Sequence, residues 1–260
     1  MKPTGRSDAR SFSLAGRVAL VTACSKGIGK ACALALARAG ADVVLGLREK
    51  AAGRALAERI AGMGRQALCV QMDVSNMGEI ASGVRAGLDR FERIDILVNN
   101  AGIGESNPAE RVTEKDFDET IAVNLKGSFF VAQTVGRAMI ERRQGTIINI
   151  GSQAGFVALP TESVYCMTKA AISHLTKCLA LEWARYNVTV NAVAPTFIET
   201  PGTRPALADK AFRKWVERSI PLGRIGDPME VAWPVVFLAS PAASLITGAT
   251  LMIDGGWTLQ

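Results

Sequence analysis

Tyr165 and Lys169 are the two residues of this sequence whose types and spacing best suit acid–base chemistry. Residues four apart on a helix share one face, so the phenol and the ammonium can point into one cleft. A phenol ordinarily has a pKa of about 10, and a nearby cation favours its ionised form. We therefore expect Lys169 to lower the pKa of Tyr165, although an isolated pair with this spacing is usually only a surface pair.

A glycine-rich turn over residues 22–29, between an apolar run and a helical segment, is the second candidate site. Glycines let the backbone approach a phosphate group closely, and a helix N-terminus offers free N–H groups and a positive dipole end. The turn therefore suggests dinucleotide binding. Taken alone, such a segment is often only a turn, so this interpretation depends on the rest of the pattern.

Seven short apolar runs must position these groups, and longer helical segments separate them. The runs are 17–22, 42–47, 66–74, 95–100, 145–152, 188–195 and 249–254. They lack clean polar alternation, which indicates burial on both faces of a parallel sheet. The first helical segment closes at Gly40 and the second at Gly62 or Gly64. We predict a single α/β domain of the Rossmann type, doubly wound around a seven-stranded parallel sheet, with functional residues just after its strands.

Composition and charge narrow the possible functions. Of 260 residues, 48% are hydrophobic and 21% charged, which suits one domain over 15–260 after a flexible, polar extension over 1–14. The net charge of +6 comes without clustered cations or a recognition motif, so nucleic-acid binding is disfavoured. Five cysteines without a CxxC pair and a single histidine predict no metal site. With no signal peptide and no run of 18 apolar residues, we expect a cytoplasmic protein that does not bind membranes.

The order of further polar residues along the chain also bears on the function. Ser152 ends an apolar run thirteen residues before Tyr165, Asn124 lies upstream in VNLKG, and the sequence NNAG occupies 99–102. Together with the turn and Lys169, these motifs resemble the short-chain dehydrogenase/reductase family over about residues 14–257, including its 3-oxoacyl-carrier-protein reductases and its gluconate and polyol dehydrogenases. The resemblance implies an oxidoreductase that moves hydride between a nicotinamide cofactor and the carbonyl or secondary alcohol of a small ketone, polyol or sugar acid.

The resemblance also implies a catalytic tetrad of Asn124, Ser152, Tyr165 and Lys169. In the reductive direction Tyr165 would protonate the carbonyl oxygen while Ser152 hydrogen-bonds it as charge develops. Lys169 would assist Tyr165 and bond the nicotinamide ribose, and Asn124 would hold a water that links Lys169 to solvent. His174 lies nine residues beyond Tyr165, half a turn out of phase, so packing is expected for it instead of catalysis.

The cofactor site implied by the resemblance draws on several strand ends. Its residues are Thr22, Ser25, Lys26, Gly27, Ile28, Gly29, Arg48, Asp73, Val74, Asn100, Ala101, Gly102, Tyr165, Lys169, Pro195, Ile198 and Thr200. Leu47 occupies the slot where NAD-dependent relatives carry an acid, and Arg48 with Lys26 can clamp a 2′-phosphate, so NADP(H) is favoured and NAD(H) stays possible. The alternative is that Arg48 only begins a helix. Ala23 and Thr196 stand where the family pattern has glycine, and a methyl at 23 is strained if that position uses positive φ.

Two alternatives to a small-molecule dehydrogenase stay open. A 3-oxoacyl-carrier-protein reductase often grips its acidic carrier with two arginines, and these slots look like Phe130 and Tyr186 here. Other cations lie near them in the sequence: Arg142, Arg143 and Arg185. A non-catalytic nucleotide-binding scaffold usually lacks a tetrad residue, whereas all four are present.

Two further expectations concern the oligomeric state and a loop near the site. The C-terminal segment 247–257 looks like the family strand that packs against a neighbouring subunit in tetrameric members, so we expect a homotetramer. The stretch 196–222 reads as irregular and is a candidate lid over the site.

Overall fold

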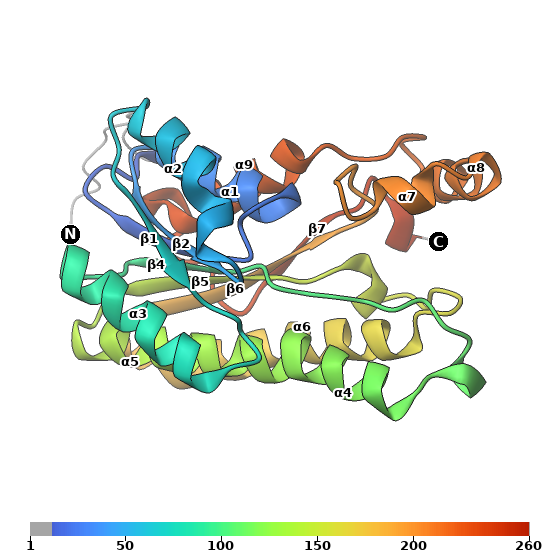
Figure 1. Cartoon of the computed structure of the whole chain (residues 1–260), viewed down its shortest axis with the longest axis horizontal. Helices are drawn as coiled ribbons and strands as arrows, with labels where there is room; N and C mark the ends of the chain where they lie inside the picture. The colour runs from blue at the N-terminus through green and yellow to red at the C-terminus, as the bar shows by residue number, and fades with distance from the viewer. Residues whose placement is uncertain (1–11, 260) are drawn as a thin grey trace.

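Seven parallel strands form one sheet in the computed structural model, which describes residues 12–259 (Figure 1). Their order is β3-β2-β1-β4-β5-β6-β7, which confirms the predicted doubly wound architecture. The strands are β1 (Val18–Thr22), β2 (Asp42–Leu47), β3 (Ala67–Gln71), β4 (Ile96–Asn99), β5 (Gly145–Ile150), β6 (Val188–Pro195) and β7 (Thr250–Ile253). Because β3 and β5 end earlier than predicted, Asp73, Val74 and Ser152 lie in loops beyond the sheet edge.

Six helices cover the two faces of this sheet (Figure 1). One face carries α1 (Gly27–Arg38), α2 (Arg54–Ala61) and α9 (Pro228–Ala239), and the other carries α3 (Met77–Phe91), α5 (Ser128–Glu141) and α6 (Ser163–Trp183). Successive strand residues such as Leu20 and Val21 belong to the two opposite cores. Since both faces are covered, both side chains are apolar, and this explains the absence of alternation in the sequence.

The remaining helices lie outside this double layer. α4 (Glu114–Ile121) packs against α6 and runs into a π-helical segment, Ala122–Gly127. α7 (Arg204–Leu207) and α8 (Lys210–Ser219) extend beyond the sheet near β7 (Figure 1). The stretch 196–222, expected to be irregular, is therefore partly helical. Its aromatic residues pack with the C-terminal segment, as Phe197 stacks on Trp257 with ring centroids 5.6 Å apart.

Strand order reverses between β1 and β4, and Thr22 ties the loops that leave these two strands. The backbone N–H groups of Asn100 and Ala101 donate to Thr22 Oγ1 at 2.9 and 3.1 Å. Thr22 is fully buried, so this contact is shielded from water. The two predicted halves of the cofactor site are thereby held in a fixed relation, at the position where doubly wound folds bind ligands.

The ordered packing begins earlier than residue 15. Leu14 is fully buried and its N–H donates to Ala39 O at 2.8 Å. The ring of Phe12 lies against Phe237, with centroids 6.2 Å apart. Part of the predicted flexible extension 1–14 is thus packed on the domain, while residues 1–11 lie outside the described part of the chain. Within residues 12–259, no helix is both long and apolar enough to cross a lipid bilayer.

Glycines end the first two helices close to their predicted positions. α1 stops at Arg38, and Gly40 follows with φ of +106°. α2 stops at Ala61 with Gly62 as its C-cap, and Gly64 takes the left-handed conformation at φ of +72°. The left-handed turn after α2 is therefore made by Gly64, because Gly62 keeps helical angles.

A buried carboxylate, Asp95, lies just before β4, at the sheet edge opposite to the strand ends that carry the predicted site. Its side chain is 1% exposed and pairs with Arg93, whose Nε lies 2.7 Å from Asp95 Oδ2. Arg17 and Arg142 lie 3.7 and 3.9 Å from Asp95 Oδ1, and the N–H of Val18 donates to Oδ2 at 2.9 Å. One carboxylate thus joins the starts of β1 and β4 to the end of α5.

Replacing this carboxylate should destabilise the fold. Asp95→Asn removes the charge but keeps the shape, so three arginines and one N–H lose an ionised acceptor. Because the arginine side chains are about one-third exposed, we expect a loss of about 2 kcal/mol in the free energy of unfolding, less than for a fully buried pair. Urea denaturation measures it. The control Glu58→Gln breaks an exposed pair with Arg54 and should cost less than about 0.5 kcal/mol; equal losses in the two variants would contradict the assignment.

Candidate active site

Tyr165 and Lys169 share one face of α6, as their spacing predicts. Lys169 Nζ lies 5.5 Å from the centre of the Tyr165 ring. The lysine is buried, and its Nζ donates to the backbone oxygen of Ile150, the last residue of β5, at 2.9 Å. This bond fixes the first turns of α6 against the carboxyl end of the central sheet. The phenol and the ammonium therefore meet where the fold leads us to expect a ligand.

Ser152 lies just after β5, and its side chain lies close to Tyr165. The side chain is buried, its Oγ accepts from the N–H of Ala154 at 3.1 Å, and it donates to Gln153 Oε1 at 2.9 Å. A hydrogen bond with Ser152 also lowers the pKa of Tyr165. The sequence analysis missed Gln153, a buried amide that holds the serine hydroxyl, because nothing in the sequence distinguishes it from an ordinary loop residue.

Asn124 lies in the π-helical segment, and its side chain hydrogen-bonds two other segments of the protein. Its Nδ2 donates to Ile103 O at 2.8 Å and to Thr168 Oγ1 at 3.1 Å, and its Oδ1 accepts from the N–H of Ile103 at 2.8 Å. The amide thus ties the loop after β4 to α6. Both amide protons are thereby used, while the backbone carbonyl and the second lone pair of Oδ1 can still accept from a water. The expectation that Asn124 holds a water therefore stays a prediction.

Burial controls the ionisation of the Tyr165–Lys169 pair. It raises the pKa of Tyr165 to about 12, and the hydrogen bond between Tyr165 and Ser152 acts in the opposite direction. It lowers the pKa of Lys169 to about 8. In the protein alone desolvation is the largest influence on the phenol, and the ammonium bonds Ile150 O. A lowering of the phenol pKa by Lys169 together with the oxidised nicotinamide stays a prediction for the complex with cofactor. At neutral pH Tyr165 is a protonated phenol that can donate its proton.

The glycine-rich turn leads into α1 with an open helix N-terminus. Lys26 is the N-cap residue of α1 and makes no side-chain capping bond, so the first N–H groups of the helix are left available. Gly27 has φ of +57°. A Cβ on Gly29 would lie 2.4 Å from Asn100 Nδ2 and 2.8 Å from Ala23 O, so only glycine fits there.

Ala23 adopts the left-handed conformation, with φ of +52°. This is the condition under which we expected its methyl group to be strained, and the usual cost for a non-glycine residue is roughly 1–2 kcal/mol. The amide of Asn100 holds the turn in place, because its Nδ2 donates to Thr22 O at 3.0 Å and to Ala23 O at 3.2 Å.

The segment after β6 closes onto this turn. Pro195 ends β6, Ile198 is buried, and a Cβ on Gly27 would contact the Thr200 side chain at 3.3 Å. Thr200 and Thr203 hydrogen-bond each other, which fixes the bend of the segment. The predicted residues of this segment and of the glycine-rich turn therefore lie together.

Other predicted cofactor residues occupy distinct places around the site. A Cβ on Gly102 would lie 3.4 Å from Lys169 Nζ, so the NNAG loop passes directly over the lysine. Asp73 accepts from Ser75 through Oδ1, in a local turn. Val74 is buried against Gly127, so its side chain supports the π-helical segment and leaves only its backbone for a ligand.

Arg48 and Lys26, the cations assigned to a 2′-phosphate, are both exposed. Within residues 12–259, neither side chain forms an ion pair. Arg48 directly follows β2, and its backbone oxygen accepts a hydrogen bond from the Gln71 side chain. His174, expected to pack in a core or an interface, is exposed on the single chain.

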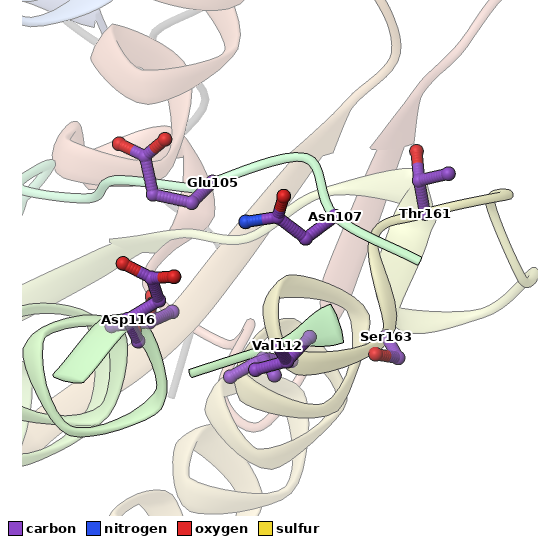
Figure 2. A pocket seen from close by; sticks show the side chains of 8 residues that line it. Glu105, Asn107, Val112, Asp116, Thr161 and Ser163 are labelled. Carbon is purple, nitrogen blue, oxygen red and sulfur yellow. Dashed lines mark hydrogen bonds between the residues drawn. The ribbon is translucent and has the colours of Figure 1, made fainter. Parts of the chain in front are cut away.

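A small pocket lies between the loop after β4, α4 and the start of α6 (Figure 2). Glu105, Asn107, Asp116, Thr161 and Ser163 contribute polar side chains to it, and the apolar wall comes from Val112 and Val164. The N–H of Asn107 donates to Thr161 O at 2.9 Å, which joins the two sides of the pocket. Sequence reasoning did not single out these residues.

Comparison with known proteins gives one consistent result. Residues 22–258 match the family described as enoyl-(acyl carrier protein) reductase. The chain is 42% identical to the NAD-dependent glycerol dehydrogenase of Listeria innocua over 96% of this chain and 97% of the relative. It is 43% identical to a 3-oxoacyl-[acyl-carrier-protein] reductase of Synechocystis, over 95% and 99% of the two chains. The crystal structure of a gluconate 5-dehydrogenase from Burkholderia cenocepacia in complex with NADP and tartrate superposes with a TM-score of 0.93 at 39% identity, over 96% and 98% of the two chains.

The burial of Lys169 predicts a pH dependence of stability. Its folded pKa of about 8 lies below the ordinary 10.5, so between these values the unfolded chain binds the extra proton and stability rises with pH. From about pH 7.5 to 9.5 this should contribute about 2 kcal/mol. Urea unfolding of the wild type and of Lys169→Met at both pH values isolates it, because other titrating groups cancel in the difference. An identical pH dependence in both proteins would refute the lowered pKa.

Proposed function

Because the chain belongs to the short-chain dehydrogenase/reductase family, it is an NAD(P)-dependent oxidoreductase of alcohol and carbonyl groups, and we propose that NADP(H) is its preferred cofactor and Tyr165 its catalytic acid/base. The observation that carries the proposal is the buried Lys169 held beside Tyr165 by the carboxyl end of β5. Its substrate is a small ketone, polyol or sugar acid.

The residues around the site fit a dinucleotide. The uncapped N-terminus of α1 suits a pyrophosphate, and Gly29 leaves room only for backbone close to it. Gly102 and Lys169 lie together where the nicotinamide ribose is proposed to bind. Ile198 and Thr200 are proposed to line the nicotinamide side. When bound, the cofactor supplies or accepts the hydride.

The chain's own residues handle the proton and the developing charge. Tyr165 holds its proton at neutral pH, and donating it to a carbonyl oxygen leaves a phenolate that the Lys169 ammonium stabilises. Ser152 is proposed to donate to the same oxygen, and for this its hydroxyl must exchange Gln153 Oε1 for the substrate. Asn124 keeps the loop after β4 in register with α6, so its role in this proposal is to position.

The preference for NADP(H) rests on charge. Arg48 and Lys26 are exposed cations without ion-pair partners among residues 12–259, while Leu47, in the slot of the acid, is buried. A 2′-phosphate would gain charge-assisted hydrogen bonds there, and a ribose hydroxyl would find no carboxylate. The Burkholderia gluconate 5-dehydrogenase bound to NADP supports the same choice, whereas the glycerol dehydrogenase is named as NAD-dependent.

A carrier-protein reductase is the second candidate, since one relative with this name is 43% identical. The arginines that could hold an acidic carrier, Arg142, Arg143 and Arg185, lie at the end of α5 and before β6, at the sheet edge opposite to Tyr165. A carrier bound there could deliver its acyl group only to another subunit. This alternative therefore depends on the homotetramer, which we propose together with a cytoplasmic location on the family resemblance alone.

Replacing Tyr165 with Phe should abolish the chemistry and keep the cofactor site. Removing the acid/base hydroxyl is expected to lower kcat by about a thousandfold, while the Kd for NADPH changes by less than about threefold. Absorbance at 340 nm with a panel of ketones and polyols gives the rate, and nucleotide fluorescence gives the affinity. The matched control is Tyr186→Phe at the chain's other tyrosine. Full activity of Tyr165→Phe, or no binding of either cofactor by the wild type, would overturn the proposal.

Arg48→Ala should discriminate between the two cofactors. Losing a charge-assisted contact to the 2′-phosphate is expected to weaken NADPH binding about tenfold or more and to leave NADH binding within about twofold. Titration of each nucleotide by fluorescence measures both values, with Arg59→Ala on the exposed side of α2 as the control. Equal losses for NADPH and NADH would remove the basis for a phosphorylated cofactor.

A further inference from the structure

Glu162 is a partly buried carboxylate at the start of α6, three residues before Tyr165. It occupies the N-cap position of the helix, where acidic and hydroxyl side chains usually bond the first N–H groups. Its side chain makes no such bond. The carboxylate therefore serves neither the helix end nor, since it lies outside the proposed tetrad, the proton transfer.

The carboxylate lies close to the catalytic phenol. A Cβ on Gly104, in the loop after β4, would lie 3.4 Å from Glu162 Oε2 and 3.1 Å from Tyr165 Cδ2. The backbone of Gly104 thus touches both side chains, and its lack of a side chain allows this approach. Residues three apart on a helix are neighbours on one face, so Glu162 and Tyr165 border the same space. The charge of Glu162 is felt at the phenol, where it raises the pKa of Tyr165.

The protein commits one hydroxyl and no cation to this carboxylate. Within residues 12–259, Glu162 forms no ion pair. A hydrogen bond with Ser106 lowers its pKa, and Ser106 Oγ also lies 2.6 Å from Thr161 Oγ1. Because the two oxygens of a carboxylate can accept several hydrogen bonds, one serine leaves most of this capacity open. Glu162 is left as a partly desolvated acceptor beside the reacting group.

The surrounding charges do not favour an anionic substrate. Glu105, on the same loop as Gly104, adds a second carboxylate near Glu162 and raises its pKa. In the segment that follows β6, Arg204 and Arg213 both pair with Glu199. Lys169 is buried and bonded to Ile150 O. A substrate carboxylate next to Tyr165 would therefore meet the negative charge of Glu162 and Glu105.

We propose that Glu162 determines specificity by accepting a hydrogen bond from a hydroxyl group near the reacting carbon, so that the enzyme selects neutral polyols and hydroxyketones over sugar acids. This inference rests on the proposed function and narrows its substrate class. A carboxylate acceptor bonds a hydroxyl strongly when partly desolvated and repels a second carboxylate at the same distance. One side chain thus binds the hydroxyl of a polyol and repels the carboxylate of a sugar acid. Specific binding sites commonly combine attraction and repulsion in this way.

Matched substrate pairs test this selection directly. Glycerol and glycerate, threitol and threonate, and glucitol and gluconate differ only in a CH2OH group replaced by a carboxylate. Oxidation of each by the wild type is followed at 340 nm with NADP+, and the ratio of kcat/KM within a pair is the readout. We expect the polyol to be favoured by at least about tenfold in the pair that is turned over best.

Three variants separate specificity from folding. Glu162→Gln keeps the shape and should lower the polyol-to-acid ratio about tenfold or more, with the Kd for NADPH unchanged. Glu162→Lys should raise kcat/KM for the acid, a gain that a misfolded protein cannot show. The control Glu110→Gln removes an exposed carboxylate from the segment between β4 and α4 and should leave the ratio unchanged.

The measured outcomes separate the role of Glu162 from the proposed function. A wild type that prefers the acids, a ratio unaffected by Glu162→Gln, or NADPH binding without turnover of any pair member would overturn the role of Glu162 and leave the cofactor assignment standing. Failure to bind either nucleotide would overturn the proposed function itself.

Discussion

The site depends on keeping an ammonium group dry beside a phenol. Burial of Lys169 lowers its pKa to about 8, and the protein compensates with one strong hydrogen bond to the backbone oxygen of Ile150. The cost of desolvating the lysine is repaid only while α6 stays docked on the end of β5. The same docking brings the phenol of Tyr165 to Ser152. The ionisation of the site therefore depends on the packing of α6 against the end of β5.

Hydrogen bonds from side chains to the backbone transmit this constraint to the other loops. Asn124 connects the loop after β4 to α6, and Asn100 connects the same loop to the glycine-rich turn. Thr22 completes the connection by accepting two N–H groups from the β4 end. Because Asn124 and Asn100 each join the loop after β4 to another segment, and Lys169 joins α6 to Ile150, the ends of β1, β4 and β5 are fixed as a unit. A strained residue such as Ala23 can persist in this setting, because its neighbours determine its conformation.

Charged side chains are arranged differently at the two edges of the sheet. At the far edge of the sheet one buried carboxylate, Asp95, gathers three arginines and helps to hold the strand starts. At the site edge the arrangement differs, since the side chains of Arg48, Lys26 and Glu162 form no ion pairs within the described chain. Unpaired charges at a ligand edge contribute little to the fold and are free to recognise a ligand. In this respect the positive side suits a phosphorylated cofactor and the negative side a hydroxylated substrate.

The sequence alone determined the sheet, its seven strands and the face shared by Tyr165 and Lys169, because hydrophobic runs and helical spacing are local properties of the chain. It also placed the glycine-rich turn before a helix, whereas positive φ at Ala23 entered only as the condition for strain. Only the tertiary structure decided the ionisation of the pair, the hydrogen-bond partners of Asn124 and the position of Gln153 and Glu162. These depend on burial and on partners that come from distant segments, and neither can be deduced from spacing along one chain. The desolvation that raises the pKa of Tyr165 exists only once the helices have closed over the sheet.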